Sequence, residues 1–166
     1  MNSIEAVTVF NNIKGYIIFK ENFKNKCVDI IVELSGLEPG LHGFHIHEYG
    51  DLREGCKSTC NHYNPKNKNH GGPLDKDRHM GDLGNIKVNK NGICKMKLQD
   101  KIIKLRGKYS IIGRSVVIHE DEDDLGKGNH KDSHTTGHAG KRIGCGVIGY
   151  SKNCLLYTSP SPRDGR

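Results

Sequence analysis

The chain of 166 residues contains no tryptophan, only four phenylalanines and only five prolines. With aromatic residues at 6%, its hydrophobic core has to be small and largely aliphatic. No apolar run approaches the roughly 18 residues of a membrane-spanning helix, so we expect no membrane association. The first ten residues also lack the basic start and the apolar stretch of a secretory signal peptide. We therefore expect a cytoplasmic protein.

Glycine is abundant instead, with 21 residues, nearly twice its usual share of about 7%. Because proline is scarce and glycine follows no strict repeat, a collagen-like chain is excluded and turn-rich β structure is favoured. The length suits one domain, which we expect to span residues 1–152. Residues 153–166 contain two Ser-Pro steps and no strand pattern, so we expect a disordered tail outside the fold.

The formal net charge is +7, and ten histidines add to this basic character. Such a balance favours an anionic partner, which could be nucleic acid, an acidic membrane or a small anion. No run of lysine and arginine with interleaved aromatics is present, so we expect no specific nucleic-acid binding. Six cysteines in an intracellular chain indicate metal or thiol chemistry before a disulfide scaffold.

Apolar residues alternate with period two along most of the chain, and no window shows a capped helical stripe. The pattern predicts strands at residues 6–10, 16–20, 27–34, 41–47, 86–88, 93–98, 101–105, 115–119 and 145–150. Asn91-Gly92 predicts a hairpin turn between two of them. We therefore expect an all-β fold, an eight-stranded antiparallel Greek-key sandwich or barrel.

Two connections, residues 48–84 and 120–144, are too long for ordinary turns and carry little apolar material. Connections longer than about 12–15 residues in a compact domain are usually functional or disordered. Most of the histidines lie in these two loops or on the strands beside them. We therefore expect the chemistry of the protein in the loops.

His45 and His47 are two residues apart on a predicted strand, so their side chains point to the same face. Both imidazoles could bind one ion, with a third donor such as His119 from another strand end. Imidazole ligands suit copper, zinc, iron or nickel. The alternative is that they are ordinary surface or core histidines.

A second group, His62, His70, His79 and Asp82, lies within the first long loop. Three histidines and one carboxylate make a four-coordinate zinc set with no open position, typical of a structural site. Metal binding would explain how a loop so poor in apolar residues could be ordered. The alternative is a solvated polar loop with scattered histidines.

Seven segments resemble, in order and spacing, the motifs of the copper/zinc superoxide dismutase family. They are residues 40–51, 61–65, 70–73, 78–84, 117–120, 123–128 and 144–149. The resemblance runs from about residue 6 to residue 150. It implies an oxidoreductase that converts superoxide to oxygen and hydrogen peroxide by alternating reduction and oxidation of a bound copper. It also implies one copper and one zinc per subunit, a homodimer, and copper delivery by a chaperone.

The same resemblance assigns roles to individual residues. It implies that copper is bound by His45, His47, His62 and His119, and zinc by His62, His70, His79 and Asp82. His62 would then bridge both metals and deliver a proton to the product. Asp123 would link His45 to His70, Cys56 and Cys145 would form a disulfide, and Arg142 would hold the anion beside copper.

The sequence also departs from the family. Thr135 stands where many members carry a lysine, although Arg142 has lysines nearby in the chain. Three additional histidines, His130, His134 and His138, lie in the second loop, and we expect neutral polar residues there. The alternatives are that they add positive charge at low pH or offer an adventitious metal site. Two other functions stay open from the sequence, namely a non-enzymatic metal-buffering or copper-delivering protein and salt-sensitive, nonspecific nucleic-acid binding.

Overall fold

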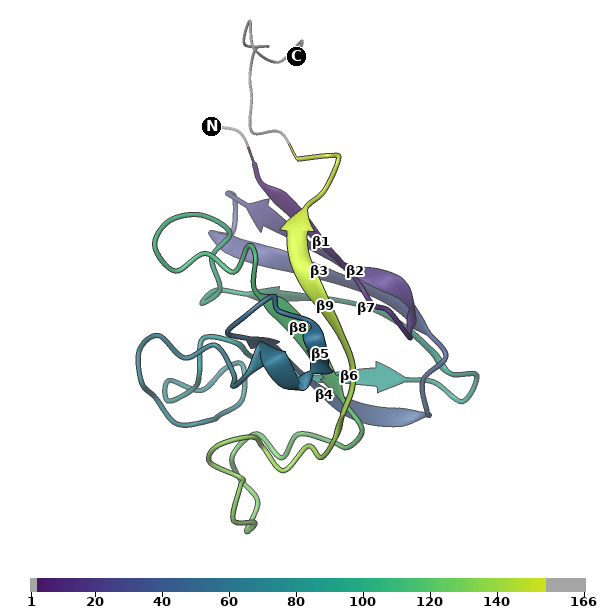
Figure 1. Ribbon diagram of the computed structural model, residues 1–166. Coiled ribbons are helices and arrows are strands. Elements are labelled where there is room, and N and C mark those ends of the chain that lie inside the picture. Colours follow the sequence, from purple (N-terminus) through teal and green to yellow (C-terminus); the bar gives the residue numbers. More distant parts are fainter. Residues whose placement is uncertain (1–2, 155–166) are drawn as a thin grey trace, which may run out of the picture.

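The alternating pattern folds into nine strands and one short 3-10 turn in residues 3–154, the part of the chain that the computed structural model describes (Figure 1). The strands are β1 (Glu5–Val9), β2 (Lys14–Asn22), β3 (Cys27–Ser35), β4 (Gly40–His47), β5 (Arg53–Cys56), β6 (Asp82–Val88), β7 (Ile93–Asp100), β8 (Ser115–His119) and β9 (Arg142–Tyr150). The turn is η1 (Lys57–Thr59). No α-helix occurs in the described range, as predicted. Nor does that range hold a helix long and apolar enough to cross a membrane.

Eight strands form one antiparallel sheet in the order β6-β4-β8-β9-β1-β2-β3-β7. The sheet curls into a nearly closed barrel (Figure 1). Because β3 lies next to the edge strand β7 and β4 lies next to the edge strand β6, the short connection from β3 to β4 spans the opening between the two edges. Fully buried aliphatic and aromatic side chains fill its interior, including Ile17, Phe19, Ile30, Phe44 and Ile118. The all-β, eight-stranded Greek-key prediction is confirmed.

The strand predicted at residues 101–105 is wrong. The carboxylate of Asp100 accepts hydrogen bonds from the backbone N–H groups of Ile102 (3.0 Å) and Ile103 (2.9 Å), so the chain turns where β7 ends. Ile103 and Leu105 are each 1% exposed and contribute to the core from an irregular connection. These two apolar residues are two positions apart, as on a strand, but the reason is that both pack against the core.

The predicted turn at Asn91-Gly92 is present, but β6 and β7 do not form a hairpin ladder. Gly92 has φ +77°, a left-handed conformation that glycine adopts without strain. Its N–H donates to Asn89, whereas its carbonyl accepts from Gly36 in the turn after β3. In the sheet order, β6 and β7 are the two edges, so the turn connects strands across the opening of the barrel.

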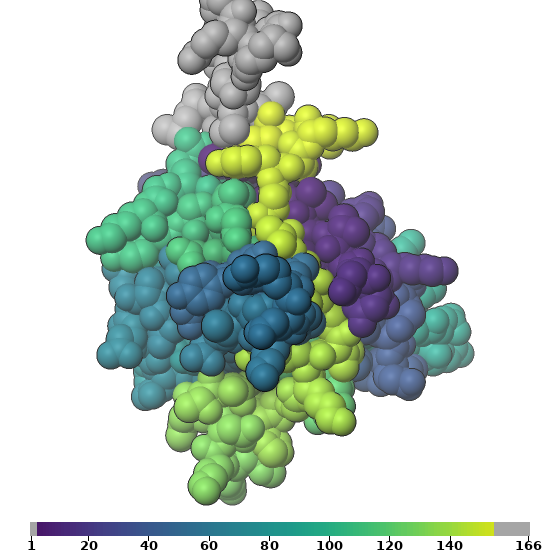
Figure 2. Space-filling view, in the orientation of Figure 1, coloured from purple at the N-terminus to yellow at the C-terminus, as the bar shows by residue number. Residues whose placement is uncertain are grey.

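The two long loops project from the barrel, and the second forms one end of the molecule (Figure 2). The first contains β5, which the sequence did not predict, and η1; β5 contacts β9 and both elements lie beside it (Figure 1). A disulfide between Cys56 and Cys145, with 5.7 Å between their Cα atoms, joins this loop to β9. Residues 155–166 of the predicted tail lie outside the described residues.

Candidate metal centre

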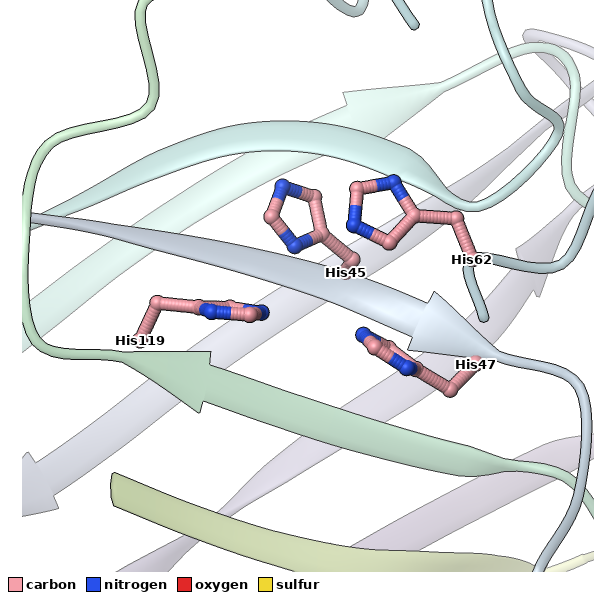
Figure 3. A group of neighbouring side chains, drawn as sticks. All are labelled: His45, His47, His62 and His119. Carbon is pink, nitrogen blue, oxygen red and sulfur yellow. The ribbon is translucent and has the colours of Figure 1, made fainter. Parts of the chain in front are cut away.

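Four histidine rings from three parts of the chain converge beside the barrel wall (Figure 3). His45 and His47 project from β4, His119 ends β8, and His62 comes from the first loop. One ring nitrogen from each lies within 4.8 Å of the others. The register of β4 and β8, which pairs His45 with Val117, brings the ends of these strands together. The four residues therefore form one buried cluster, which we call the four-histidine cluster.

In each of these rings, one nitrogen lies within hydrogen-bonding distance of a protein atom, and the other has no such partner among the described residues. Nδ1 of His47 lies 2.9 Å from the carbonyl oxygen of Cys60, and Nδ1 of His119 lies 3.1 Å from that of Gly140. Nε2 of His45 lies 2.6 Å from Asp123. The opposite nitrogens, together with Nε2 of His62, are buried without a hydrogen-bond partner among the described residues. Because buried polar atoms are almost always satisfied, four such nitrogens facing one space fit a bound metal ion.

A second cluster lies on the other side of His62, and its atoms are spaced like the ligands of one ion. Nδ1 of His62 lies 3.1 Å from Nδ1 of His79 and 3.0 Å from Oδ1 of Asp82. The same oxygen lies 2.9 Å from Nδ1 of His70 and 3.3 Å from Nδ1 of His79. Ligands about 2.0 Å from a tetrahedral zinc ion are roughly 3.3 Å apart. These four residues, the zinc-type cluster below, therefore fit zinc without rearrangement of the loop.

The separation of the two clusters is not complete, because His45 also lies close to the second one. Its ring stacks on that of His62 with centroids 3.9 Å apart, so a nitrogen of His45 falls within 4.8 Å of donor atoms of His62, His70 and Asp82. His79 is nevertheless nearer to Asp82, at 3.3 Å, and Nε2 of His45 is occupied by Asp123. We therefore assign His79 to the zinc-type cluster.

Asp123 connects the two clusters directly. One carboxylate oxygen lies 2.6 Å from Nε2 of His45 and the other lies 2.7 Å from Nε2 of His70. Asp123 is 1% exposed, and Gly137 packs so tightly against it and His70 that a Cβ atom would collide with both. A carboxylate on the far nitrogen of a ligating histidine fixes its tautomer and orientation. The carboxylate thus orients one ring of each cluster.

Burial sets the protonation of the histidines. It lowers the pKa of His62 and of His119 to about 4, and it lowers the pKa of His45 and His47 well below the usual value. Burial also disfavours the charged form of His70, but hydrogen bonds to Asp123 and Asp82 outweigh it and raise its pKa to about 9. The four-histidine cluster is therefore neutral at pH 7, the form in which imidazole binds metals.

The carboxylate of the zinc-type cluster is charged. Burial disfavours ionisation of Asp82, but hydrogen bonds from His62, His70 and His79 dominate and hold its pKa well below its usual range. Its second oxygen accepts from the backbone N–H groups of His79 (2.8 Å) and Gly71 (3.0 Å). The loop thus presents a permanent negative charge to a cation.

Arg142 opens β9 and lies beside the disulfide. Its Nη1 donates to the carbonyl of Cys56 (2.9 Å) and to Oγ1 of Thr59 (3.2 Å). Half-burial lowers the pKa of Arg142, but a guanidinium stays protonated at any physiological pH. Because Cys56 is bonded to Cys145, three residues after Arg142, the disulfide fixes the loop that holds this cation. The implied disulfide is confirmed.

The additional loop histidines do not join either cluster. The rings of His130 and His138 stack on each other with centroids 3.6 Å apart, and Nδ1 of His138 lies 2.7 Å from the exposed carboxylate of Asp132. His134 is exposed as well. Among residues 3–154, no third group of histidine, cysteine, aspartate and glutamate side chains could hold a metal ion.

Sequence reasoning missed a buried histidine behind the site. The two ring nitrogens of His42 lie 2.8 Å from the carbonyl oxygen of His119 and 2.7 Å from that of Glu38. His42 thus ties the end of β8, which carries His119, to the chain before β4. The period of β4 already puts His42 on the face opposite to His45. Its carbonyl partners, like those of His47 and His119, leave no signal in the sequence.

Comparisons with known proteins agree with this geometry. The family model described as copper/zinc superoxide dismutase (SODC) matches residues 13–148. Superoxide dismutase [Cu-Zn] 3 of Arabidopsis thaliana is 48% identical over 149 residues, covering 90% of each chain. Superoxide dismutase [Cu-Zn] of Paramecium bursaria Chlorella virus 1 is 53% identical over 151 residues, covering 90% of this chain and 80% of its own.

Two further relatives extend the comparison. Extracellular superoxide dismutase [Cu-Zn] of Drosophila melanogaster is 55% identical over 137 residues, covering 82% of this chain and 76% of its own. The crystal structure of the clock protein EA4 superposes with a TM-score of 0.86 at 45% identity, covering 91% of this chain and 97% of its own. The chain therefore belongs to the copper/zinc superoxide dismutase family, oxidoreductases that act on superoxide.

Proposed function

We propose that this protein converts two superoxide anions and two protons into one molecule of oxygen and one of hydrogen peroxide at the paired clusters. The ligands that we assign are His45, His47, His62 and His119 for copper, and His62, His70, His79 and Asp82 for zinc. The observation that carries the proposal is the set of buried ring nitrogens without partners among the described residues, which face a common space. Copper supplies the one-electron redox change that dismutation needs, which zinc lacks.

His62 holds the proton for the product in this proposal. Its Nδ1 lies among the zinc-type atoms, 3.0 Å from Asp82, whereas its Nε2 faces the four-histidine cluster without a partner among the described residues. One nitrogen cannot bind copper and carry a proton at the same time, so Nε2 would carry the proton only while it is not bound to the metal, and the ring would stay anchored through Nδ1. A neutral imidazole nitrogen beside a reduced dioxygen anion is suited to general acid catalysis.

Arg142 binds the substrate anion in the same proposal. Only its Nη1 is used by the hydrogen bonds to Cys56 and Thr59, and its remaining N–H groups make none with residues 3–154. Those groups can donate to superoxide in charge-assisted hydrogen bonds. Since the disulfide and Thr59 fix the guanidinium, the anion is held without a large loss of side-chain entropy.

The decisive experiment compares metal-loaded full-length protein with His119→Ala and with His134→Ala, an exposed histidine of the same region. We expect His119→Ala to lose copper and at least 100-fold of the dismutase rate, and His134→Ala to stay within twofold of the parent. Equal rates in the parent and His119→Ala would refute the proposal. A parent that retains copper but does not turn over would instead indicate a metal-buffering protein.

We also propose a homodimer, with an apolar patch as its interface. Tyr49 and Tyr150 are each 53% exposed and Val147 is 38% exposed. Gly50 packs against Gly113 and Val147, so this part of the patch is continuous. The side chain of Ile148, which follows Val147 on β9, is fully buried and is not part of this patch. An isologous contact would cover these exposed groups.

Light scattering tests the dimer on the full chain. We expect twice the 18.5 kDa mass of the chain for the parent and a single chain mass for Val147→Lys. Ile93→Lys is the matched control, because Ile93 on β7 is 37% exposed, and it should stay dimeric. A monomeric parent, or equal masses for both variants, would contradict the assignment.

We propose a cytoplasmic location and copper delivery by a chaperone. Cys27, Cys60, Cys94 and Cys154 are unpaired thiols, which suits a reducing compartment. The copper ligands are exposed to solvent by 5% or less, which favours delivery by a partner over capture of free copper. Cell fractionation tests the location, since the Drosophila relative is extracellular by name. Metal-free protein should take up copper faster from a copper-carrying chaperone than from an equal concentration of free copper salt.

A further inference from the structure

A groove of about 680 Å³ lies between the first long loop and the end of β7, and none of the metal-cluster residues lines it. Leu74, Lys76, Arg78 and Met80 line it from the loop, and Lys101 and Ile102 line it from the sheet side. Its volume falls in the range of about 300–1,000 Å³ typical of small-molecule sites.

The floor of the groove is preformed by a buried ion pair. Arg78 is 3% exposed, and its Nη1 donates to Asp100 at 2.7 Å and to the carbonyl of Pro73 at 2.8 Å. Its Nη2 and Nε donate to the carbonyls of Met80 (2.7 Å) and His79 (3.0 Å). Because these charges are mutually satisfied, they hold the loop against β7 and are not available to a ligand.

Apolar side chains line both walls. Leu74 is 96% exposed, the highest value among the large hydrophobic side chains of the described chain, and Ile102 on the opposite wall is 43% exposed. Met80 and Cys27 are mostly buried, at 8% each. Exposed apolar groups on both sides of a concave surface indicate a place where hydrocarbon is covered on binding.

The rim is basic. Four lysines face one rim carboxylate, Asp75, a formal surplus of three positive charges. Nζ of Lys66 lies 4.2 Å from the ring centroid of Tyr109, and Nζ of Lys68 donates to the carbonyl of Lys76 at 3.0 Å. Lys76 and Lys101 have no carboxylate within ion-pair distance in residues 3–154. These two ammonium groups are therefore available to an anion.

We propose that this groove binds amphiphilic anions, molecules with a hydrocarbon chain and a carboxylate or similar head group, as free ligands. The chain would lie between Leu74 and Ile102, and the head group would pair with Lys76 or Lys101. A polyphosphate or nucleic acid would leave the apolar walls uncovered, and an uncharged hydrocarbon would leave the lysines unused. An amphiphile of negative charge satisfies both features together.

Isothermal titration of the metal-loaded full chain with dodecanoate, below its micelle concentration, tests the proposal. We expect saturable binding that Lys76→Glu/Lys101→Glu weakens at least tenfold. The matched control is Lys14→Glu/Lys90→Glu, which makes the same charge change at two exposed lysines away from the groove, and it should bind within twofold of the parent. Leu74→Ser, a substitution on an exposed side chain, should also weaken binding several-fold without affecting folding.

Three results would overturn the proposal. They are equal affinities for the two double variants, dodecyltrimethylammonium binding as tightly as dodecanoate, and dodecanoate that leaves the Leu74 and Met80 methyl resonances unshifted. Vesicles of phosphatidylglycerol distinguish the source of the ligand. We expect no co-sedimentation with them, and co-sedimentation without binding of free dodecanoate would show that the surface binds membranes instead.

Discussion

At the scale of single residues, Asp123 acts on both metal clusters, because its two carboxylate oxygens orient His45 and His70. We predict that Asp123→Asn weakens zinc binding by about 10–100-fold, since an amide presents one acceptor where the carboxylate presents two. Competition with a chelator measures this. Asp132→Asn, in which an exposed carboxylate beside His138 is changed, is the control and should leave zinc affinity unchanged. Equal affinities for both variants would remove Asp123 from this role.

A second prediction at this scale concerns how the buried histidines make the stability of the metal-free protein depend on pH. His62 and His119 have a pKa of about 4 in the fold and about 6.5 when unfolded, so the unfolded chain takes up protons first as the pH falls. Their stabilising contribution is therefore present above pH 6.5 and lost toward pH 4, by roughly 3 kcal/mol each.

The contribution of His70 to stability changes with pH in the opposite direction. Its pKa is raised to about 9, so its contribution is present below pH 6.5 and lost as the pH rises toward 9. Stability of the metal-free chain should thus fall on both sides of about pH 6.5. Urea unfolding at pH 4.5, 6.5 and 9 measures this. His119→Ala should flatten the acid side, whereas His134→Ala should not, and a curve without a maximum would contradict the assignment.

At the scale of structural elements, the disulfide connects β5 and η1 to β9 across 89 residues of sequence. Replacing both Cys56 and Cys145 by serine should lower the free energy of unfolding by roughly 4–5 kcal/mol, from the entropy of the released loop. The dismutase rate should also fall, because Arg142 donates to the carbonyl of Cys56.

Denaturant unfolding and dismutase activity, both measured on the metal-loaded double variant, test this role of the disulfide. Cys60→Ser, which changes an exposed unpaired thiol in the same loop, is the control and should preserve stability. A double variant as stable and as active as Cys60→Ser would show that the disulfide stabilises neither the loop nor the position of Arg142.

At the scale of the whole molecule, the net charge of +7 favours the approach of a small anion. Steering of superoxide by the protein's field is a general property of this enzyme class. We predict that kcat/KM falls as ionic strength rises from 10 to 200 mM, because the Debye length shortens to about 10 Å at 0.1 M. Stopped-flow measurements give the slope.

Matched variants identify the charges responsible. Lys131 and Lys141 are exposed and lie in the loop before Arg142, so Lys131→Gln/Lys141→Gln should lower the rate at low salt and reduce the slope. Lys90→Gln/Lys95→Gln removes the same charge from the turn before β7 and from β7, which lies four positions from β9 in the sheet order, and should leave both the rate and the slope nearly unchanged. A rate independent of salt would exclude steering in this protein.

Local patterns in the sequence were sufficient for the strands and for part of the site. The period-two alternation located most of β1–β9 because side chains two residues apart on a strand point to the same face. The same rule placed His45 and His47 on one face. The metal-ligand roles and the disulfide pairing followed from resemblance to a family. The same local rule misplaced a strand at residues 101–105, since packing on a core from an irregular segment also spaces apolar residues.

Only the tertiary structure decided what depends on contacts between distant segments. The register of β4 and β8 brings His45 near His119, and the path of the first loop places His62 between two clusters. The backbone carbonyls of Cys60 and Gly140 contact Nδ1 of His47 and of His119, and this leaves Nε2 of each ring for a metal. Any residue could supply such a carbonyl, so the sequence does not reveal it. The sequence by itself therefore determined most of the strands, the charge and the kinds of ligand. Their convergence, and the basic groove beside Leu74, required the fold, because loop paths and sheet order are set by long-range packing.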